Sequence, residues 1–253
     1  MTDSGRDNPL LSNIRPRRAL ARTLKWLGWG IAGFVILSVL AVGLLRWLNP
    51  PTSAFMLKQQ LAGRLNSQQP AILYHEWVDL SAMPPSLALA VVAAEDQRFP
   101  QHAGFDLVEI RKAWQRYRNG GRLRGASTIS QQTAKNLFLW SGRDWARKGL
   151  EAWFTLLIEA LWSKQRVLEV YLNIAQFSPD TFGVGAASWR YFERPAIALK
   201  PDQAALLAAV LPNPKIYRLD APSARVEQRA RWIRRQMRQL GGVEYLEGLG
   251  IGP

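Results

Sequence analysis

One long apolar stretch constrains the fold of this chain more than any other feature of the sequence. From Trp26 to Leu45 there is no charged residue. At ~1.5 Å per residue, a helix of about 20 residues spans roughly 30 Å, which is the thickness of a bilayer core. Trp26, Trp29 and Trp47 lie where aromatic side chains anchor membrane helices at the lipid–water interface. The chain is therefore predicted to have a membrane anchor and a separate folded part.

The charges that flank this stretch predict its orientation. A basic cluster precedes it, and only Arg46 follows closely: Arg6, Arg15, Arg17, Arg18, Arg22 and Lys25. By the positive-inside rule the N-terminus is cytoplasmic. We expect a disordered basic tail at 1–25, an anchor at 26–48 and an extracytoplasmic domain at 49–253. A cleaved signal peptide is the alternative, but it would have a shorter apolar core and a small-residue cleavage site, which 48–51 does not offer.

The amino-acid composition limits which binding partners and which kinds of catalytic or metal site are possible. The net charge of +14 favours an anionic partner. Nucleic acid is a poor candidate because most basic residues lie outside the predicted cytoplasmic tail. The absence of cysteine excludes disulfides, thiolate metal sites and cysteine nucleophiles. With only His75 and His102 available, a histidine-based zinc site is not expected.

Two adjacent carboxylates, Glu95 and Asp96, follow a segment that is apolar on every face, residues 87–94. Such a segment predicts a buried helix, and Pro100 prevents it from continuing far. Burial and the negative end of the helix dipole both favour a protonated carboxyl group. A carboxylate in this position suits a general acid or base. The alternative is that these residues cap a neighbouring helix or pair with an arginine.

A second polar cluster occupies residues 125–136. Ser127 or Thr128 is expected to cap a helix on which Thr128, Gln131, Gln132 and Lys135 share one face. Hydroxyl, amide and amine groups together suit a hydroxyl-rich anionic ligand such as a sugar diphosphate. A polar surface face is the alternative, although no carboxylate on that face balances Lys135.

Two other segments are basic. Residues 106–124 combine six Arg and Lys residues with Trp114 and Tyr117, which predicts either contact with anionic lipid headgroups or a solvated charged face. A helix near 223–240 has an apolar seam and many arginines. We expect the seam to pack on the core and the arginines to point outward.

Four clusters, in this order and spacing, resemble the motifs of the peptidoglycan glycosyltransferases that polymerise lipid II. They are Glu95-Asp96-x-x-Phe99-x-x-His102-x-Gly104, Gly125-x-Ser127-Thr128-Ile129-x-Gln131-Gln132-x-x-Lys135-Asn136, Arg147-Lys148-x-x-Glu151 and Lys164-x-x-x-Leu168-Glu169-x-Tyr171-Leu172-Asn173. The resemblance covers about 70–215. The loop at 177–180 departs from the glycine-rich turn expected in this family, which affects loop details only.

The resemblance implies a mostly α, lysozyme-like, two-lobed domain behind the single membrane helix. It implies catalytic roles for Glu95 and Glu151, with Glu95 as the general base. The substrate-binding or bracing residues that it implies are Asp96, Phe99, His102, Ser127, Thr128, Gln131, Gln132, Lys135, Asn136, Arg147, Lys148 and Glu169. Mg²⁺ or Mn²⁺ on the substrate diphosphate is the only cofactor it suggests, and the sequence has no dedicated metal site.

The same resemblance implies partners and a location. The partners are lipid II, glycan linked to undecaprenyl diphosphate, the membrane, and cell-wall synthesis or division proteins. The location is the inner membrane, with the catalytic domain in the periplasm. Ser-x-x-Lys and Lys-Thr-Gly, which a penicillin-binding transpeptidase requires, do not occur, and too little chain follows residue 220. This favours the monofunctional form.

Two other functions remain open from the sequence. A lysozyme-like enzyme that cleaves glycans also uses a glutamic acid, but it needs an acid for the leaving oxygen rather than three cations. A non-catalytic scaffold of a wall-building complex is the other alternative, which the intact motifs disfavour.

Overall fold

The computed structural model describes residues 14–65, 72–121, 125, 127–142 and 144–252. The chain divides into two compact units, Met1–Leu44 and Leu45–Pro253. The described part is mostly helical, as the sequence predicts, with one pair of very short strands.

The first unit is a single helix, α1 (Ile14–Leu44). Its segment Leu20–Leu44 is, within the described residues, the one stretch long and apolar enough to cross a membrane. The prediction of a disordered tail through Lys25 is wrong in part, because the helix begins at Ile14. Arginine, alanine, leucine and lysine favour helix, and Pro16 lies in the first turn, where proline is tolerated. The tail residues before Ile14 lie outside the described part of the chain.

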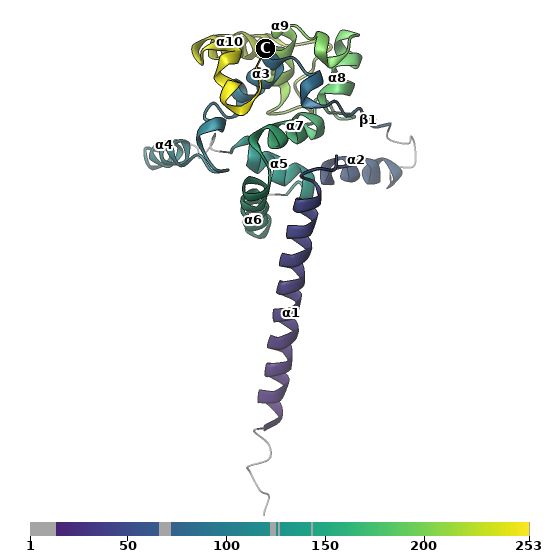
Figure 1. Cartoon of the computed structure of the whole chain (residues 1–253), viewed down its shortest axis with the longest axis vertical. Coiled ribbons are helices and arrows are strands. Elements are labelled where there is room, and N and C mark those ends of the chain that lie inside the picture. The colour runs from purple at the N-terminus through teal and green to yellow at the C-terminus, as the bar shows by residue number, and fades with distance from the viewer. Residues whose placement is uncertain (1–13, 66–71, 122–124, 126, 143, 253) are drawn as a thin grey trace, which may run out of the picture. The chain divides into compact units, whose positions relative to one another are not determined.

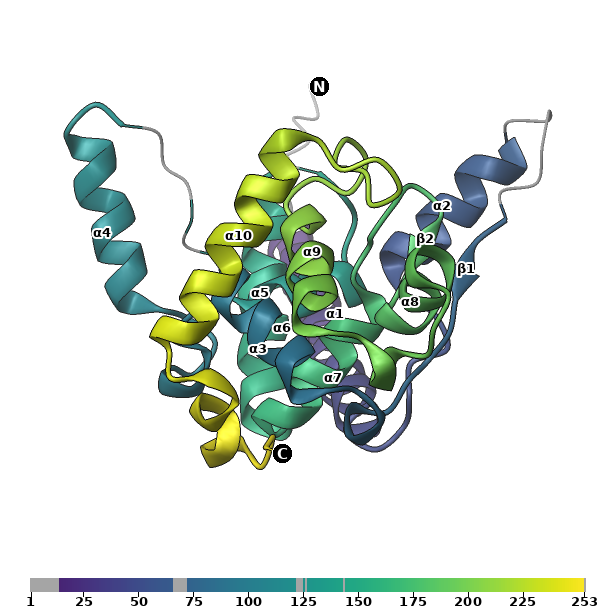
Figure 2. The same cartoon turned by 90° about the horizontal axis from the view of Figure 1, so that it is seen from above.

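The second unit contains the remaining elements (Figures 1 and 2). In chain order they are α2 (Ala54–Leu65), β1 (Tyr74–His75), η1 (Leu80–Ala82), α3 (Pro85–Glu95), η2 (Phe99–Gln101), α4 (Leu107–Arg118), α5 (Ile129–Phe138), α6 (Trp145–Leu161), α7 (Lys164–Ile174), β2 (Thr181–Phe182), α8 (Val184–Phe192), η3 (Ala196–Ala198), α9 (Pro201–Val210), α10 (Ala224–Gln239) and η4 (Gly242–Leu249).

Helix α3 is the centre of this unit, as its uninterrupted apolar sequence predicts. Every residue from Leu87 to Ala93 is buried. The helix packs against α9, which is also apolar, and against α10. It ends at Glu95, so the last turn brings this carboxylate out of the core toward α5. A second group of packed helices consists of α5, α6 and α7.

The starts of the second helix group follow from their capping residues. Thr128 accepts a hydrogen bond from the Gln131 amide and caps α5, Asp144 accepts from the Arg147 amide and caps α6, and Ser163 accepts from the Arg166 amide and caps α7. The start at Thr128 is predicted from the sequence, since threonine satisfies free amides of a first turn, and aspartate and serine do the same at the other two starts.

The two short strands join segments that are far apart in sequence. Tyr74 and His75 of β1 pair in parallel with Thr181 and Phe182 of β2. The Asn173 side chain reinforces this junction by accepting from the Val78 amide and donating to the Val78 carbonyl, both at 2.8 Å. A strand of two residues gives no sequence signal for its distant partner.

Helix α4 projects from the rest of the unit (Figures 1 and 2). Asp106 caps it by accepting from the amides of Val108 and Glu109, and within the helix only Ala113 is buried. Its exposed apolar side chains recur at helical spacing on one face: Leu107, Ile110, Trp114 and Tyr117. The helix therefore has an apolar face with no partner among the described residues. Arg122 and Arg124, part of the predicted basic segment, lie outside that description.

Arg166 fastens the first residues of the second unit to α7. Its guanidinium donates to the carbonyls of Leu45 and Leu48 and to the side chain of Asn49. It also pairs with Glu169 and lies over the Trp77 ring. The folded unit therefore includes residues 45–49, and a truncation that keeps it whole must begin at Leu45.

Candidate active site

Glu95 lies at the end of α3 and is held from two sides. Its Oε2 accepts a hydrogen bond of 3.0 Å from Gln132 Nε2 of α5, and its Oε1 lies 3.2 Å from Arg229 Nη2 of α10. Gln132 is oriented in turn by the Tyr171 hydroxyl, which donates to Gln132 Oε1 at 3.2 Å. Four helices therefore fix one carboxylate.

The surroundings of Glu95 make it more basic than an ordinary carboxylate. Only 13% of its side chain is exposed. Burial raises the pKa of Glu95, and the Gln132 hydrogen bond and the charges of Arg229 and Lys135 oppose this rise without cancelling it. Burial also raises the pKa of Tyr171 well above its usual range, and the Glu95 and Asp96 carboxylates add to the effect. The tyrosine therefore stays protonated and continues to donate to Gln132.

A cluster of cations occupies α5 and α6 on one side of Glu95. Arg147 Nη1 lies 2.7 Å from Glu151 Oε2, and Lys148 pairs with the other oxygen of the same carboxylate. The side chain of Glu151 is 5% exposed, whereas that of Lys148 is 46% exposed. One buried carboxylate thus orients two cations.

Lys135 completes the cation cluster. Burial lowers the pKa of Lys135, and Arg147 and Lys148 lower it further, while Glu151 and Glu95 act in the opposite direction. These mutual effects place Lys135 in the electrostatic field of both carboxylates. Three cations share one strong carboxylate partner, so an anionic ligand would relieve their repulsion.

A groove runs beside Glu95 on the α4 and α10 side. It has a volume of about 470 Å³, and its lining includes Glu95, Arg98, Lys112, Ser127 and Trp232. Of the predicted substrate-binding residues, Ser127 is exposed in this groove. Arg98 and Lys112 are paired with Asp106 and Glu109, which also line the groove, so the cations that suit an anionic substrate are those of the cluster on α5 and α6.

Two buried polar atoms near the cation cluster have no hydrogen-bond partner among the described residues: Asn136 Oδ1 and Arg147 Nε. Buried polar atoms are nearly always satisfied in folded proteins. The two atoms lie on α5 and α6, in or beside residues predicted to bind substrate. A ligand that reaches the cluster could satisfy both.

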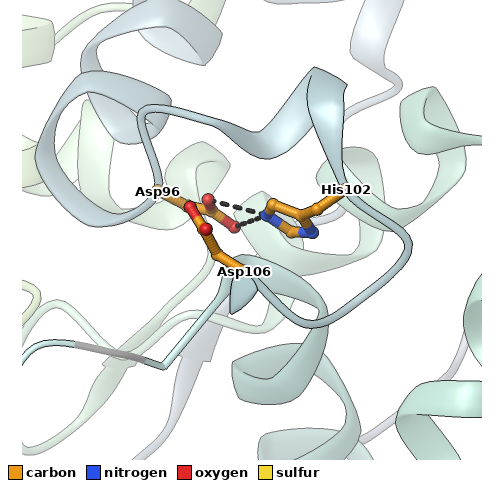
Figure 3. A group of neighbouring side chains, drawn as sticks. All are labelled: Asp96, His102 and Asp106. Carbon is orange, nitrogen blue, oxygen red and sulfur yellow. Dashed lines mark hydrogen bonds and ion pairs between the residues drawn. The ribbon is translucent and has the colours of Figure 1, made fainter. Parts of the chain in front are cut away.

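Asp96, His102 and Asp106 form a compact group (Figure 3). His102 Nε2 lies 2.9 Å from Asp96 Oδ1, and the Ile129 amide donates to Asp96 Oδ2 at 3.0 Å. Asp106 caps α4 and pairs with Arg98. Because these oxygens already accept hydrogen bonds from N–H groups, the group does not fit a resident divalent cation, which needs free carboxylate oxygens. Its contacts instead connect the end of α3 to the start of α5, and we call this group the brace.

Thr128 and Gln131 belong to the same brace. The Gln131 side chain accepts from the Thr128 amide, and Thr128 accepts from the Gln131 amide, so the two form a capping box. The Thr128 hydroxyl also donates to the Gly104 carbonyl at 2.6 Å. Gly104 has φ +82°, and a Cβ there would come within 2.8 Å of the Glu159 and Thr155 side chains, so only glycine fits.

The four polar residues predicted to share one face of α5 therefore have two different roles. Thr128 and Gln131 are buried in the cap, whereas Gln132 and Lys135 face the Glu95 region. The helical spacing alone could not separate a capping box from a ligand-binding row, since both require polar side chains.

Phe99 and Glu169 lie away from the groove. Phe99 is fully buried, and Lys164 Nζ lies 4.5 Å from its ring centroid. Glu169 accepts from the Leu80 amide at 2.9 Å and pairs with Arg166. The structure does not bring these two residues together with Glu95, and their contacts are those of side chains that hold segments of the fold in place.

Sequence reasoning missed two residues that hold Glu95 in place, one directly and one through Gln132. Arg229 was assigned to an outward basic face, but α10 crosses beside α3 and brings its guanidinium to the carboxylate. Tyr171 acts through Gln132. No local pattern indicates either contact, because the partners are separated by 134 and 39 residues in sequence.

Replacing Asp96 with alanine is expected to destabilise the second unit by about 2–4 kcal/mol, because the Ile129 amide and His102 would each lose a buried partner. Asp96→Asn should cost less, since its amide oxygen can still accept one hydrogen bond. Thermal unfolding of the purified protein in detergent measures the difference, with Asp220→Ala at an exposed pair as the control. Equal stability of the Asp96 and Asp220 variants would contradict a bracing role.

Comparison with known proteins extends the site analysis. Residues 61–238 match the transglycosylase family. The chain is 52% identical over 238 residues to the biosynthetic peptidoglycan transglycosylase of Klebsiella oxytoca, covering 94% of this chain and 93% of that protein. It is 50% identical over 233 residues to the protein of the same name from Xanthomonas campestris pv. campestris (strain B100), covering 92% and 95%. A relative of that name from Cronobacter sakazakii is 51% identical over 234 residues.

Proposed function

This chain belongs to the transglycosylase family of peptidoglycan glycosyltransferases, and from that premise we propose that it polymerises lipid II into linear glycan strands. The donor is a glycan on undecaprenyl diphosphate, and the acceptor is lipid II. Each cycle forms one β-1,4 bond from N-acetylmuramyl C1 to the N-acetylglucosamine 4-oxygen, inverts the anomeric carbon and releases undecaprenyl diphosphate. The chain forms no peptide cross-links.

The observation that carries this proposal is a base and a cation cluster on neighbouring helices. Buried Glu95 has a raised pKa and lies on α3, and Lys135, Arg147 and Lys148 lie on α5 and α6. Glu95 removes the proton from the acceptor 4-hydroxyl as its oxygen attacks C1. The bond from C1 to the diphosphate oxygen breaks, and the leaving diphosphate takes the electron pair.

The cation cluster stabilises the leaving group. A diphosphate needs positive charge more than it needs a proton, and preorganised cations in a partly buried site stabilise developing charge strongly. Arg147 Nε and Asn136 Oδ1, which have no hydrogen-bond partner in the described part of the chain, are available to a phosphate oxygen and to a substrate N–H or O–H group, respectively. Glu151 keeps Arg147 and Lys148 oriented.

The glycan-cleaving alternative fits this arrangement less well. A glycosidase needs a carboxylic acid to protonate the leaving oxygen and usually a second, functionally free carboxylate. Glu151 is bound by two cations, and Asp96 is bound by His102 and the Ile129 amide. A scaffold without activity would have no need of a cluster of three cations beside a buried base.

A divalent cation would have to come with the substrate. The Asp96 group does not fit one, and Glu151 is already neutralised by arginine and lysine. Mg²⁺ or Mn²⁺ bound to the diphosphate would add positive charge to the leaving group, and the side chains described here would still supply the base and the direct cationic contacts.

We place the enzyme at the inner membrane, with α1 as its single anchor, the N-terminus in the cytoplasm and the second unit in the periplasm. The length and apolar composition of Leu20–Leu44 and the basic residues that precede it support this orientation. The exposed apolar face of α4, flanked by arginine and lysine, is a second contact with the lipid surface.

Incubation of the purified full chain with labelled lipid II tests the function. The expected result is a ladder of long glycan products and released undecaprenyl diphosphate, with no degradation of preformed glycan. Consumption of glycan strands without polymerisation would support the cleaving enzyme instead, and no turnover of either substrate would support the scaffold.

Removal of residues 1–44 is expected to leave a folded but weaker polymerase, because the substrate lies in the bilayer and the anchor raises its local concentration. The truncated protein should still bind vesicles with anionic lipid through α4, and less so at high salt, since exposed charges are screened over about 8–10 Å. Co-sedimentation measures this binding. A Trp114→Gln/Tyr117→Gln variant should lose it, whereas Trp189→Gln at another exposed tryptophan should not. Equal binding by both variants would remove α4 from the membrane contact.

A further inference from the structure

One surface of α10 combines arginines with aromatic rings and is not used by the mechanism above. Arg225, Gln228, Arg229, Trp232 and Arg235 share one face of the helix, and together with Tyr217, Asn213 and Pro212 they line a hollow of about 710 Å³. No aspartate or glutamate contributes to this lining. A neighbouring hollow shares Arg225, Gln228 and Arg235. We call the Tyr217, Arg225, Arg229, Trp232 and Arg235 side chains the arginine surface.

Within the arginine surface, Arg229 pairs with Glu95, whereas Arg225 and Arg235 have no carboxylate beside them in the described part of the chain. On the same helix, Arg234 pairs with Asp202 and Arg231 pairs with Glu227. For Arg225 and Arg235 no ion pair occurs among the described residues. Arg225 instead lies 6.0 Å from the centroid of the Tyr217 ring. Planar guanidinium groups with free donors bind carboxylates through paired hydrogen bonds, and rings beside them add apolar contact.

The arginine surface is continuous with the catalytic groove. Trp232 lines both the hollow on α10 and the groove beside Glu95. Arg229 lines the hollow and donates to Glu95 Oε1 at 3.2 Å. A sugar bound against Glu95 therefore has the arginine surface as its immediate neighbour, on the α10 side of the carboxylate.

The position of this surface favours a soluble anion over a lipid headgroup. Helix α10 lies at one end of the second unit, and α6 lies at the other (Figure 1). Residues 45–49, where the chain enters the unit from the apolar helix, are fastened to α7 rather than to α10. The diphosphate already has its own cations on α5 and α6, so the arginine surface serves a different anionic group.

Peptidoglycan sugars carry short peptides with free carboxylates, and these peptides project from the muramyl unit. We propose that the arginine surface binds the carboxylates of the peptide on a muramyl sugar held beside Glu95. Arg225 and Arg235 contact the carboxylates, and Tyr217 and Trp232 pack against the peptide. This inference rests on the proposed polymerase function and adds a peptide subsite to it.

The test pairs two substrates with two variants of the full-length protein. One substrate is lipid II with its acidic peptide, and the other is lipid II whose peptide carboxylates are converted to amides. For the unmodified enzyme, KM for the amidated substrate should be about tenfold higher, which is the size expected for two exposed arginine–carboxylate contacts of roughly 0.7 kcal/mol each. The kcat should change little.

Arg225→Gln/Arg235→Gln should raise KM about tenfold for the acidic substrate and leave KM for the amidated substrate nearly unchanged. Arg238→Gln/Lys200→Gln removes the same charge from exposed positions outside the lining and should affect neither substrate. An equal rise of KM for both substrates in the Arg225/Arg235 variant would overturn the peptide subsite, as would no rise for either.

Two other results separate the alternatives. If the unmodified enzyme polymerises neither substrate, the proposed function fails rather than the subsite. If the Arg225/Arg235 variant keeps its KM for the acidic substrate but loses binding to anionic vesicles, the arginine surface is a lipid contact and the proposal is wrong.

Discussion

Replacing Glu95 with glutamine is expected to abolish glycan polymerisation and leave the protein folded. Glutamine has the same shape, and its amide oxygen can still accept from Gln132 or Arg229, so the packing around α3 persists. It cannot take a proton from the acceptor hydroxyl, and loss of a general base costs at least about a hundredfold in kcat. The rate of lipid II consumption by the purified protein measures the effect, with Glu247→Gln at an exposed position as the control.

The pH dependence provides an independent check on Glu95. The base acts in its ionised form, so activity should fall as the pH drops through the pKa of Glu95. Because burial raises this pKa, the fall should begin at a higher pH than for an ordinary carboxylate. The residual rate of Glu95→Gln should lack this acid limb. Turnover near that of the unmodified enzyme in the glutamine variant would remove Glu95 from the mechanism.

Lys135→Ala has the second largest expected effect, a loss of about 10²–10³ in kcat, as is typical when one preorganised electrostatic contact to developing charge is removed. Lys135→Arg should retain much more activity because it keeps the positive charge. Lys200→Ala, at an exposed lysine at the start of α9, controls for general charge loss. If the alanine and arginine variants lose equal activity, charge is not what position 135 contributes.

Lys135 should also control the alkaline side of the pH profile. Burial and the neighbouring cations lower the pKa of its ammonium group, so it loses its charge at a lower pH than an ordinary lysine. The rate should therefore decline on the alkaline side as Lys135 deprotonates. In Lys135→Arg this decline should move to higher pH, because a guanidinium does not deprotonate in that range.

Local signals in the sequence predict much of the fold. The run of apolar residues before Glu95 gives a buried helix, because no face of it tolerates water. The capping residue Thr128 gives the start of α5, because its side chain satisfies an amide within the same turn. The start of α1 at Ile14 is not predicted. A basic sequence with high helix propensity can either extend a neighbouring helix or form a tail, and its composition does not distinguish the two.

The site was predicted less completely, because several contacts depend on tertiary packing. The structure brings Glu95, Lys135, Arg147 and Glu151, which belong to the first three motifs, into one region. Arg229 reaches Glu95 only because α10 crosses α3, and nothing within its own helix distinguishes it from the arginines around it. Glu169 belongs to the fourth motif, but its carboxylate accepts a hydrogen bond from the Leu80 amide and pairs with Arg166. Membership of a motif therefore does not show which way a side chain faces.

The hydrogen-bond chain from Tyr171 through Gln132 to Glu95 has a fixed direction, and this direction governs how the enzyme resets between cycles. The tyrosine remains protonated and donates to the Gln132 oxygen, so the Gln132 amide always offers an N–H to Glu95. If Glu95 takes one proton for each bond formed, this standing donor favours its return to the ionised state. Above the pKa of the terminal phosphate on the released diphosphate, the polymerase would then release one proton to the solvent for every disaccharide added, and acidification of a weakly buffered solution would count the glycosidic bonds formed.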